Sequence, residues 1–140
     1  MVADKAKIAR HFIASIPHAQ MLGMEIEEID DGYARIIMPY HARLVGDPQT
    51  GVIHGGAVSA LMDTCGGAAV MSHPAAPGGT ATIDLRIDYM RAAKPGDTIT
   101  AEAHCTHITR NVAFVRATAV DGDADNPVAT ATGAFTVEGK

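Results

Sequence analysis

The chain has 140 residues, a formal net charge of −5 at pH 7 and an apolar fraction of 47%, with no Trp. This length predicts one domain over residues 1–140, with enough chain for one hydrophobic core. The acidic balance and the lack of a basic block exclude nucleic acid and anionic membranes as expected partners. No apolar run approaches the ~18 residues of a membrane span. The charged N-terminus does not look like a signal peptide, so we expect a cytoplasmic protein.

The first third of the chain predicts a helical segment followed by a hairpin. From residue 4 onward, Ile8, Phe12 and Ile16 recur at helical spacing, and Pro17 is expected to end that helix. Residues 18–24 predict a short helical turn, so residues 1–20 form a mainly helical N-terminal segment. Residues 24–29 and 33–38 predict two strands joined at a turn over residues 30–32. Residues 41–53 then predict a loop.

A long central helix is predicted over residues 54–72. Its buried stripe follows the i, i+3, i+4 spacing and consists of Val58, Leu61, Met62, Cys65 and Ala69. The other faces carry mostly Gly and Ala, so the helix is small or apolar nearly all round. Such a helix is expected to lie buried, with neighbouring elements in close contact.

Four strand patterns follow, over residues 80–90, 98–108, 112–120 and 128–137. In the first, alternation places Ile83, Leu85, Ile87 and Tyr89 on one face. Short turns between the strands imply antiparallel neighbours. The order of elements predicts an α+β fold in which a curved antiparallel sheet wraps around the long helix.

The segment from Thr50 to Asp63 carries most of the functional information. Gly55 and Gly56 open the helix, where the first backbone N–H groups have no partner and the helix dipole favours negative charge. Asp63 adds a possible base in an apolar stretch. At 1.5 Å rise per residue, Gly55 and Asp63 lie about 12 Å apart. If both act on one atom, Asp63 must come from a second subunit, and a two-fold homodimer satisfies this requirement.

Four motifs carry a resemblance that extends over about residues 21–137. They are residues 51–56, the sequence Leu61-Met62-Asp63, residues 84–90, and Lys94-Pro95-Gly96-Asp97. Together with the order of elements, they resemble the PaaI-like acyl-CoA thioesterases of the phenylacetate pathway, which have the hotdog fold. The resemblance implies hydrolysis of an acyl-CoA thioester to a free acid and CoA, without a cofactor, by a dimer or a dimer of dimers.

The resemblance also assigns roles to individual residues. The Gly55 N–H is expected to donate to the thioester carbonyl, and Asp63 to act as general base or nucleophile. His54 would position the loop and the substrate, with Gly56 beside it, and Thr82 would assist the attacking water. These roles suit the chemistry, because a preorganised N–H donor is worth roughly 3 kcal/mol and a carboxylate base contributes about 10²–10⁴ in rate.

Cationic residues in turns are candidates for binding the CoA phosphates. Arg91, Lys94 and Arg110 could make charge-assisted contacts there, and the alternative is that they are solvated turn charges. The seven histidines show no zinc-motif spacing, so we expect no metal site. Cys65 and Cys105 are expected to be free thiols.

One position departs from the family pattern. The family often has an Asn six residues before the His, and here that position is Pro48, flanked by Asp47 and Gln49. This departure favours an alternative function, a non-catalytic hotdog protein that binds acyl-CoA or another ligand. A hotdog dehydratase or hydratase is a third possibility.

Overall fold

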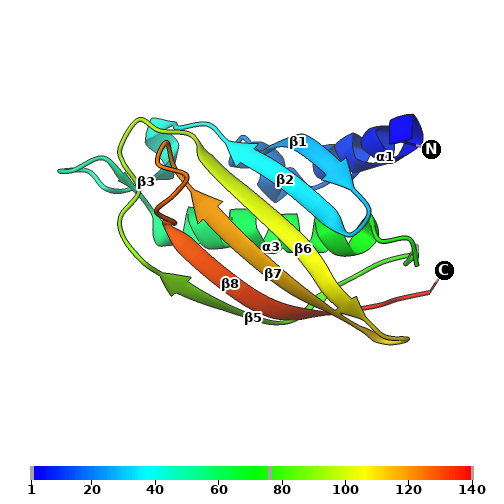
Figure 1. Ribbon diagram of the computed structural model, residues 1–140. Coiled ribbons are helices and arrows are strands. Elements are labelled where there is room, and N and C mark those ends of the chain that lie inside the picture. The colour runs from blue at the N-terminus through cyan, green and yellow to red at the C-terminus, as the bar shows by residue number, and fades with distance from the viewer. Residues whose placement is uncertain (1, 76, 140) are drawn as a thin grey trace.

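The computed structural model describes residues 2–75 and 77–139 and shows a curved antiparallel sheet with a long helix across one face (Figure 1). Residues 1, 76 and 140 of the predicted domain lie outside the described residues. The helices are α1 (Val2–Ala14), α2 (Pro17–Met21) and α3 (Gly55–Met71), with a 3-10 turn, η1, at Ala42–Leu44. The strands are β1 (Glu25–Asp30), β2 (Tyr33–Met38), β3 (Val45–Asp47), β4 (Val52–Ile53), β5 (Thr82–Tyr89), β6 (Ile99–Ile108), β7 (Val112–Val120) and β8 (Ala129–Thr136).

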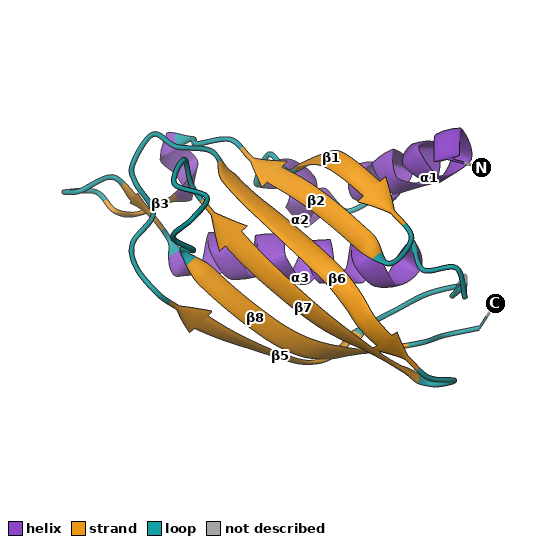
Figure 2. Ribbon diagram, viewed as in Figure 1, coloured by secondary structure: helices purple, strands orange, loops and turns teal. Residues whose placement is uncertain are grey.

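The main sheet has the strand order β1-β2-β6-β7-β8-β5, and all its neighbours are antiparallel (Figure 2). After α3 the chain therefore crosses to the far edge of the sheet, where β5 pairs with β8. One side of β5 has no strand partner among the described residues. This arrangement is the hotdog fold, so the predicted α+β fold class is confirmed.

The core lies between the sheet and α3. All five residues of the predicted helix stripe are buried, and the inward residues Ile99, Ala101 and Ala103 of β6 face them. Gly66 allows the close approach, because a Cβ there would come 2.8 Å from the Phe135 ring. Cys65 and Cys105 are both free thiols. Gly66 thus serves packing against the sheet, which offsets its low helix propensity.

Two sequence expectations were wrong in part. Alternation placed Ile83 on the same strand face as Leu85, Ile87 and Tyr89, yet Ile83 is 56% exposed. The reason is that the register of β5 against β8 shifts between Thr82 and Asp84, which takes Ile83 out of the alternating pattern. Residues 41–53 are not simply a loop, because they contain η1 and the small β3–β4 hairpin. Among the described residues, none of the helices has the length and apolar character needed to cross a membrane.

Candidate active site

The first turn of α3 leaves the backbone N–H of Gly55 open. His54 is the N-cap, and its Nδ1 accepts the Gly56 N–H at 2.7 Å. The His54 carbonyl accepts the Ala57 N–H at 3.0 Å. For the Gly55 N–H, the described part of the chain provides no acceptor. A free donor therefore sits at the positive end of the α3 dipole, where an anionic oxygen is favoured.

Two tyrosine hydroxyls anchor the segment that leads into α3. Tyr40, just after β2, donates to the Gly51 carbonyl at 2.7 Å. Tyr89, at the end of β5, donates to the Gly55 carbonyl at 2.8 Å. Gly51 has a φ of 79°, a left-handed conformation that favours glycine. The backbone that carries the free donor is thus held at both ends by side chains from the main sheet side of the fold.

Asp63 and Thr82 form a second group, farther along α3. The Thr82 hydroxyl donates to Asp63 Oδ1 at 2.6 Å, and Asp63 is half-buried. Ser59 and Thr64, the local hydroxyls that could have satisfied Asp63, instead donate to the helix carbonyls of Gly56 and Ala60. Thr82 therefore orients the carboxylate from the start of β5.

Within one chain these two groups stay apart. Thr82 contacts Asp63, and Tyr89 contacts Gly55, so β5 runs antiparallel along α3. Asp63 lies eight residues after Gly55 along the helix, which corresponds to about 12 Å. The structure thus places His54, Gly55 and Gly56 together and Asp63 with Thr82, but it does not bring the donor and the carboxylate to one point in a single protomer.

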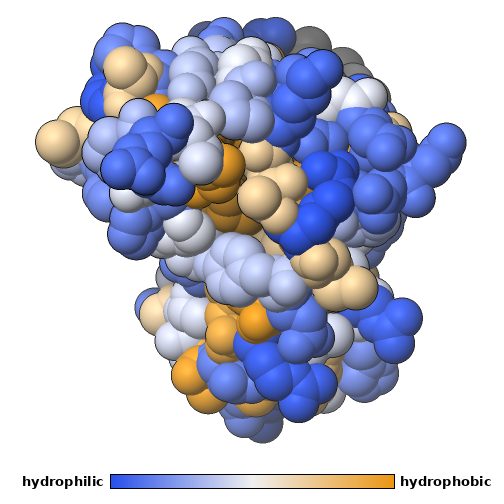
Figure 3. All heavy atoms as spheres, turned by 90° about the vertical axis from the view of Figure 1, so that its left-hand side faces the viewer, coloured by the Kyte–Doolittle hydropathy of each residue, from blue (hydrophilic) through white to orange (hydrophobic). Residues whose placement is uncertain are grey.

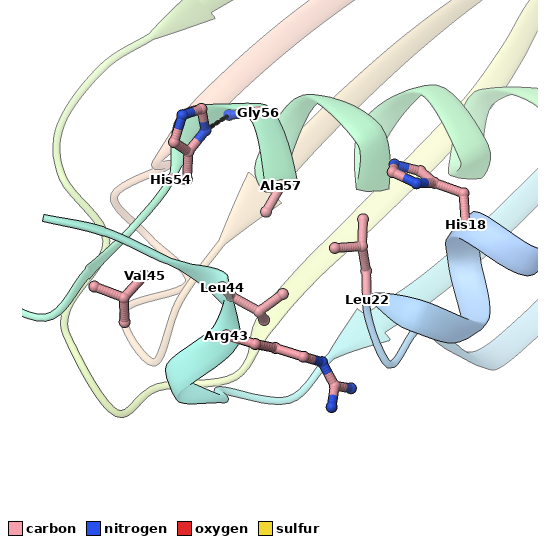
Figure 4. Close-up of a pocket in the computed structure, with 8 residues that line it drawn as sticks. All are labelled: His18, Leu22, Arg43, Leu44, Val45, His54, Gly56 and Ala57. Atoms are coloured by element: carbon pink, nitrogen blue, oxygen red, sulfur yellow. Dashed lines mark hydrogen bonds between the residues drawn. The ribbon is translucent and has the colours of Figure 1, made fainter. Parts of the chain in front are cut away.

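Two hollows flank the start of α3, at the end of the molecule that faces the viewer in Figure 3, where apolar side chains lie in recesses between polar ones. The β5-side hollow, of about 270 Å³, is lined by Val52, Ile53, Gly55, Val58, Tyr89, Met90, Arg91, Ala92, Ala93 and Val128. The α2-side hollow, of about 260 Å³, is lined by His18, Leu22, Arg43, Leu44, Val45, His54, Gly56 and Ala57 (Figure 4). A substrate bound at Gly55 therefore has space on both sides of the helix terminus.

Arg91 is engaged in a closed polar cluster. Its two terminal nitrogens each lie 2.7 Å from an oxygen of Asp121, and its remaining N–H groups donate to the carbonyls of Ala92 and Asn126. The guanidinium holds the pKa of the buried Asp121 carboxyl well below its usual range. All five donors of Arg91 are used within the protein, which leaves none of them free for a CoA phosphate.

The other two predicted cations lie far apart. Lys94 precedes Pro95, whose Cβ would be 3.5 Å from a Cβ built on Gly51, so Lys94 lies at the active-site end. Arg110 lies in the turn between β6 and β7, at the opposite end of the ten-residue β6 (Figure 1). One protomer does not bring Lys94 and Arg110 together.

Around Pro48 the chain forms a self-contained turn. Asp47 Oδ1 accepts the Gln49 N–H at 3.0 Å, and Oδ2 accepts the Thr50 hydroxyl at 2.9 Å. Both oxygens of this carboxylate are therefore used locally. In the part of the chain that the structure describes, no three His, Cys, Asp or Glu side chains come together as a metal site.

Sequence reasoning missed four side chains at this end of the molecule. Tyr40 and Tyr89 were not predicted to anchor glycine carbonyls, and His18 and Arg43 were not predicted to line a hollow. Only Tyr89 gave a signal in the sequence, because it ends an alternating strand directly before a turn. The other three come from loops or short helices whose position depends on the whole fold.

Comparison with known proteins identifies the family to which the chain is similar. Residues 50–127 match the family model described as the Thioesterase superfamily. A relative in Halobacterium salinarum is 37% identical over 69% of this chain. The matched part covers 65% of that relative's own length. The Escherichia coli medium/long-chain acyl-CoA thioesterase YigI is 25% identical over 78% of each chain. The structure of the E. coli PaaI protein from the phenylacetic acid degradation operon superposes with a TM-score of 0.86 at 25% identity, covering 99% of this chain and 97% of that one. The resemblance to PaaI-like proteins is confirmed.

Proposed function

The chain belongs to the thioesterase superfamily, and on this premise we propose that it hydrolyses an acyl-CoA thioester to the free acid and CoA. The observation that carries the proposal is the Gly55 N–H, a donor at a helix N-terminus with no acceptor in the described chain. A thioester carbonyl oxygen would accept this bond, which strengthens as negative charge develops in the transition state. One such donor is worth roughly 3 kcal/mol, or 10²–10³ in rate.

The proposal requires a second subunit, because Asp63 of the same chain is about 12 Å from Gly55 along the helix. The free side of β5 offers a way to assemble it. If two β5 strands pair antiparallel about their midpoint, between Leu85 and Arg86, Thr82 lies opposite Tyr89 of the partner subunit. Since Asp63 accompanies Thr82, and Gly55 accompanies Tyr89, the pairing brings the acid of one protomer to the donor of the other.

The exposed apolar side chains at this edge support the same assembly. Ile83, Tyr89 and Met90 are 56%, 51% and 61% exposed at or next to β5. Exposed apolar groups on an unpaired strand edge are typical of an interaction surface. A two-fold dimer also places Lys94 of one protomer at the same end as Arg110 of the partner subunit, where both are available to CoA phosphates.

In the proposed reaction, Asp63 accepts a proton from a water molecule while the water oxygen attacks the thioester carbon. The carbonyl oxygen becomes an oxyanion that the Gly55 N–H stabilises. The intermediate then collapses, the carbon–sulfur bond breaks, and the proton held by Asp63 passes to the leaving thiolate of CoA. Thr82 contributes by fixing one oxygen of the carboxylate during these proton transfers.

A non-catalytic acyl-CoA-binding protein is the second candidate, and one observation favours it. Pro48 replaces the family Asn, and the neighbouring Asp47 carboxylate is fully engaged in its own turn. Without another group to place the water, the protein would bind acyl-CoA without hydrolysing it.

Hydrolysis of a panel of short-chain, medium-chain and aryl acyl-CoA esters, followed with a thiol-reactive dye, distinguishes the two candidates. We expect release of free CoA from at least one class of thioester. Binding of CoA esters without release of thiol would reject the enzyme, and hydration of crotonyl-CoA would favour the hydratase alternative. Light scattering tests the assembly, since a protein that stays monomeric cannot form the composite site.

A further inference from the structure

The α2-side hollow adjoins the turn that presents the Gly55 N–H. His54 and Gly56, the residues on either side of Gly55, both line it (Figure 4). Its volume of about 260 Å³ is just below the range of about 300–1,000 Å³ that drug-sized ligands occupy. The hollow is therefore suited to a small group attached directly to the reacting carbonyl.

Most residues that line this hollow are apolar, and the ionisable ones are basic. Leu22, Leu44 and Ala57 supply aliphatic surface, and Leu44 and Ala57 are buried. Figure 4 shows His18 and Arg43 on either side of Leu22. None of the eight lining residues is acidic, although the chain as a whole carries a formal charge of −5. This local charge pattern is complementary to an anion.

Arg43 is available to bind such an anion. Its backbone N–H bonds to His41, but its guanidinium donates to no acceptor within the described residues. Arg91, in contrast, uses every donor inside the protein. A guanidinium with five free N–H groups can bind a carboxylate through two parallel hydrogen bonds.

A thioester substrate can carry negative charge on the CoA phosphates and at the far end of its acyl group. The position of Arg43 indicates which of the two it can bind. The CoA phosphates lie at the far end of the long pantetheine arm, well away from the sulfur. Arg43 lines the same small hollow as Gly56, so an anion that binds there must be able to enter this hollow beside the reacting carbonyl. The far end of the acyl group meets this requirement, whereas the phosphates do not.

We propose that the α2-side hollow binds the acyl group and selects thioesters of short dicarboxylic acids, whose free carboxylate pairs with Arg43. This inference rests on the proposed function and adds a substrate class to it. Leu22, Leu44 and Ala57 would contact the methylene groups of the chain. His18 would contribute a second donor to the carboxylate.

Adipyl-CoA and hexanoyl-CoA test this inference, because they share a six-carbon chain and differ only in the terminal carboxylate. Arg43→Gln is expected to lower kcat/KM for adipyl-CoA about tenfold, the effect of one partly solvated charged pair. The kcat/KM of the same variant for hexanoyl-CoA should stay within about twofold of that of the unmodified protein. Arg43→Lys keeps the charge but lacks the planar guanidinium. Its kcat/KM for adipyl-CoA should lie between those of the unmodified protein and Arg43→Gln.

Arg116→Gln is the matched control, since Arg116 is exposed on β7, on the sheet face away from α3. Arg116→Gln should leave kcat/KM unchanged for both substrates. An equal loss for both substrates in Arg43→Gln would mean that Arg43 contacts CoA itself, and no loss for either would mean that it contacts nothing; both results overturn the inference. If neither ester is hydrolysed, the ratio of their calorimetric binding constants in the two proteins decides on the hollow, and the wider acyl-CoA panel decides on the proposed function.

Discussion

The start of α3 and the cluster around Arg91 differ in whether their hydrogen-bond donors all have acceptors. At the start of α3, His54 satisfies the Gly56 and Ala57 N–H groups, and the Gly55 N–H remains open. In the Arg91 cluster every guanidinium N–H has an acceptor, and the Asp121 carboxylate also accepts the backbone N–H groups of Lys94 and Asp123.

This difference separates a structural role from a catalytic one. A buried polar group stabilises the fold when all its hydrogen bonds are made, and the Arg91 cluster meets that condition. A donor aimed at a transition state must instead be rigid and unoccupied until the substrate arrives. Rigid anchoring of Gly55 by neighbours that leave its N–H free fits the second role.

The most severe test removes the open donor itself. Gly55→Pro eliminates the N–H, and proline is well tolerated at the first position of a helix. His54, the preceding residue, already has φ −60° and ψ 134°, which a following proline requires. A Cβ at residue 55 would come no closer than 3.5 Å to Tyr89. We expect kcat to fall about 10²–10³-fold with an unchanged circular dichroism spectrum. Normal turnover would remove Gly55 from the mechanism.

The next largest loss of activity is expected when the acid Asp63 is replaced. Asp63→Asn keeps the shape of the side chain and removes the base, so kcat should fall by at least ~10² with little change in stability. Asp125→Asn, in the exposed turn before β8, is the control with the same change of charge. Turnover near that of the control would contradict the role of Asp63.

These two variants together test whether the site spans two subunits. In a heterodimer of Gly55→Pro and Asp63→Asn chains, one site carries both defects and the other carries neither. Random association after co-expression should therefore restore about a quarter of normal activity if sites are shared across a two-fold axis. Sites contained within single chains would show no recovery.

The closed cluster predicts a loss of stability rather than of catalysis. Asp121→Asn should lower the melting temperature at pH 7 by about 5 °C or more, because it leaves Arg91 partly buried without its counter-charge. Turnover at 25 °C should fall far less than in Asp63→Asn. If Asp121→Asn had normal stability but lost turnover, the Arg91 cluster would have a catalytic role and not a structural one.

The pH dependence of this variant follows from the depressed pKa of Asp121. A carboxyl with a lowered folded-state pKa contributes its full stability above the ordinary Asp value of about 3.9 and loses it as the pH falls further. The difference in melting temperature between the unmodified protein and Asp121→Asn should therefore narrow from pH 5 to pH 3. A constant difference would show that the Asp121 charge does not contribute.

The regular elements could be predicted from sequence because burial repeats along them. The range predicted for one strand, residues 112–120, matches β7 at both ends, and the stripe on α3 is buried as expected. Ile83 was misplaced because strict alternation does not anticipate the register shift between Thr82 and Asp84. The role of Arg91 could not be predicted, since its partner Asp121 is 30 residues away in sequence. Periodicity reports burial, whereas hydrogen-bond partners depend on the assembled fold.

The smallest expected effect concerns how firmly the open donor is held. Tyr89→Phe removes the hydroxyl that donates to the Gly55 carbonyl at 2.8 Å and leaves the ring in place. Loss of one neutral hydrogen bond, about 0.5–1.5 kcal/mol, should lower kcat up to about tenfold with little change in KM. Tyr33→Phe is the matched control, because Tyr33 donates to Glu102 at 2.6 Å on the sheet, away from Gly55. If both variants lose the same activity, Tyr89 acts only through general stability; if Tyr89→Phe alone lowers kcat, rigidity of the Gly55 backbone is part of catalysis.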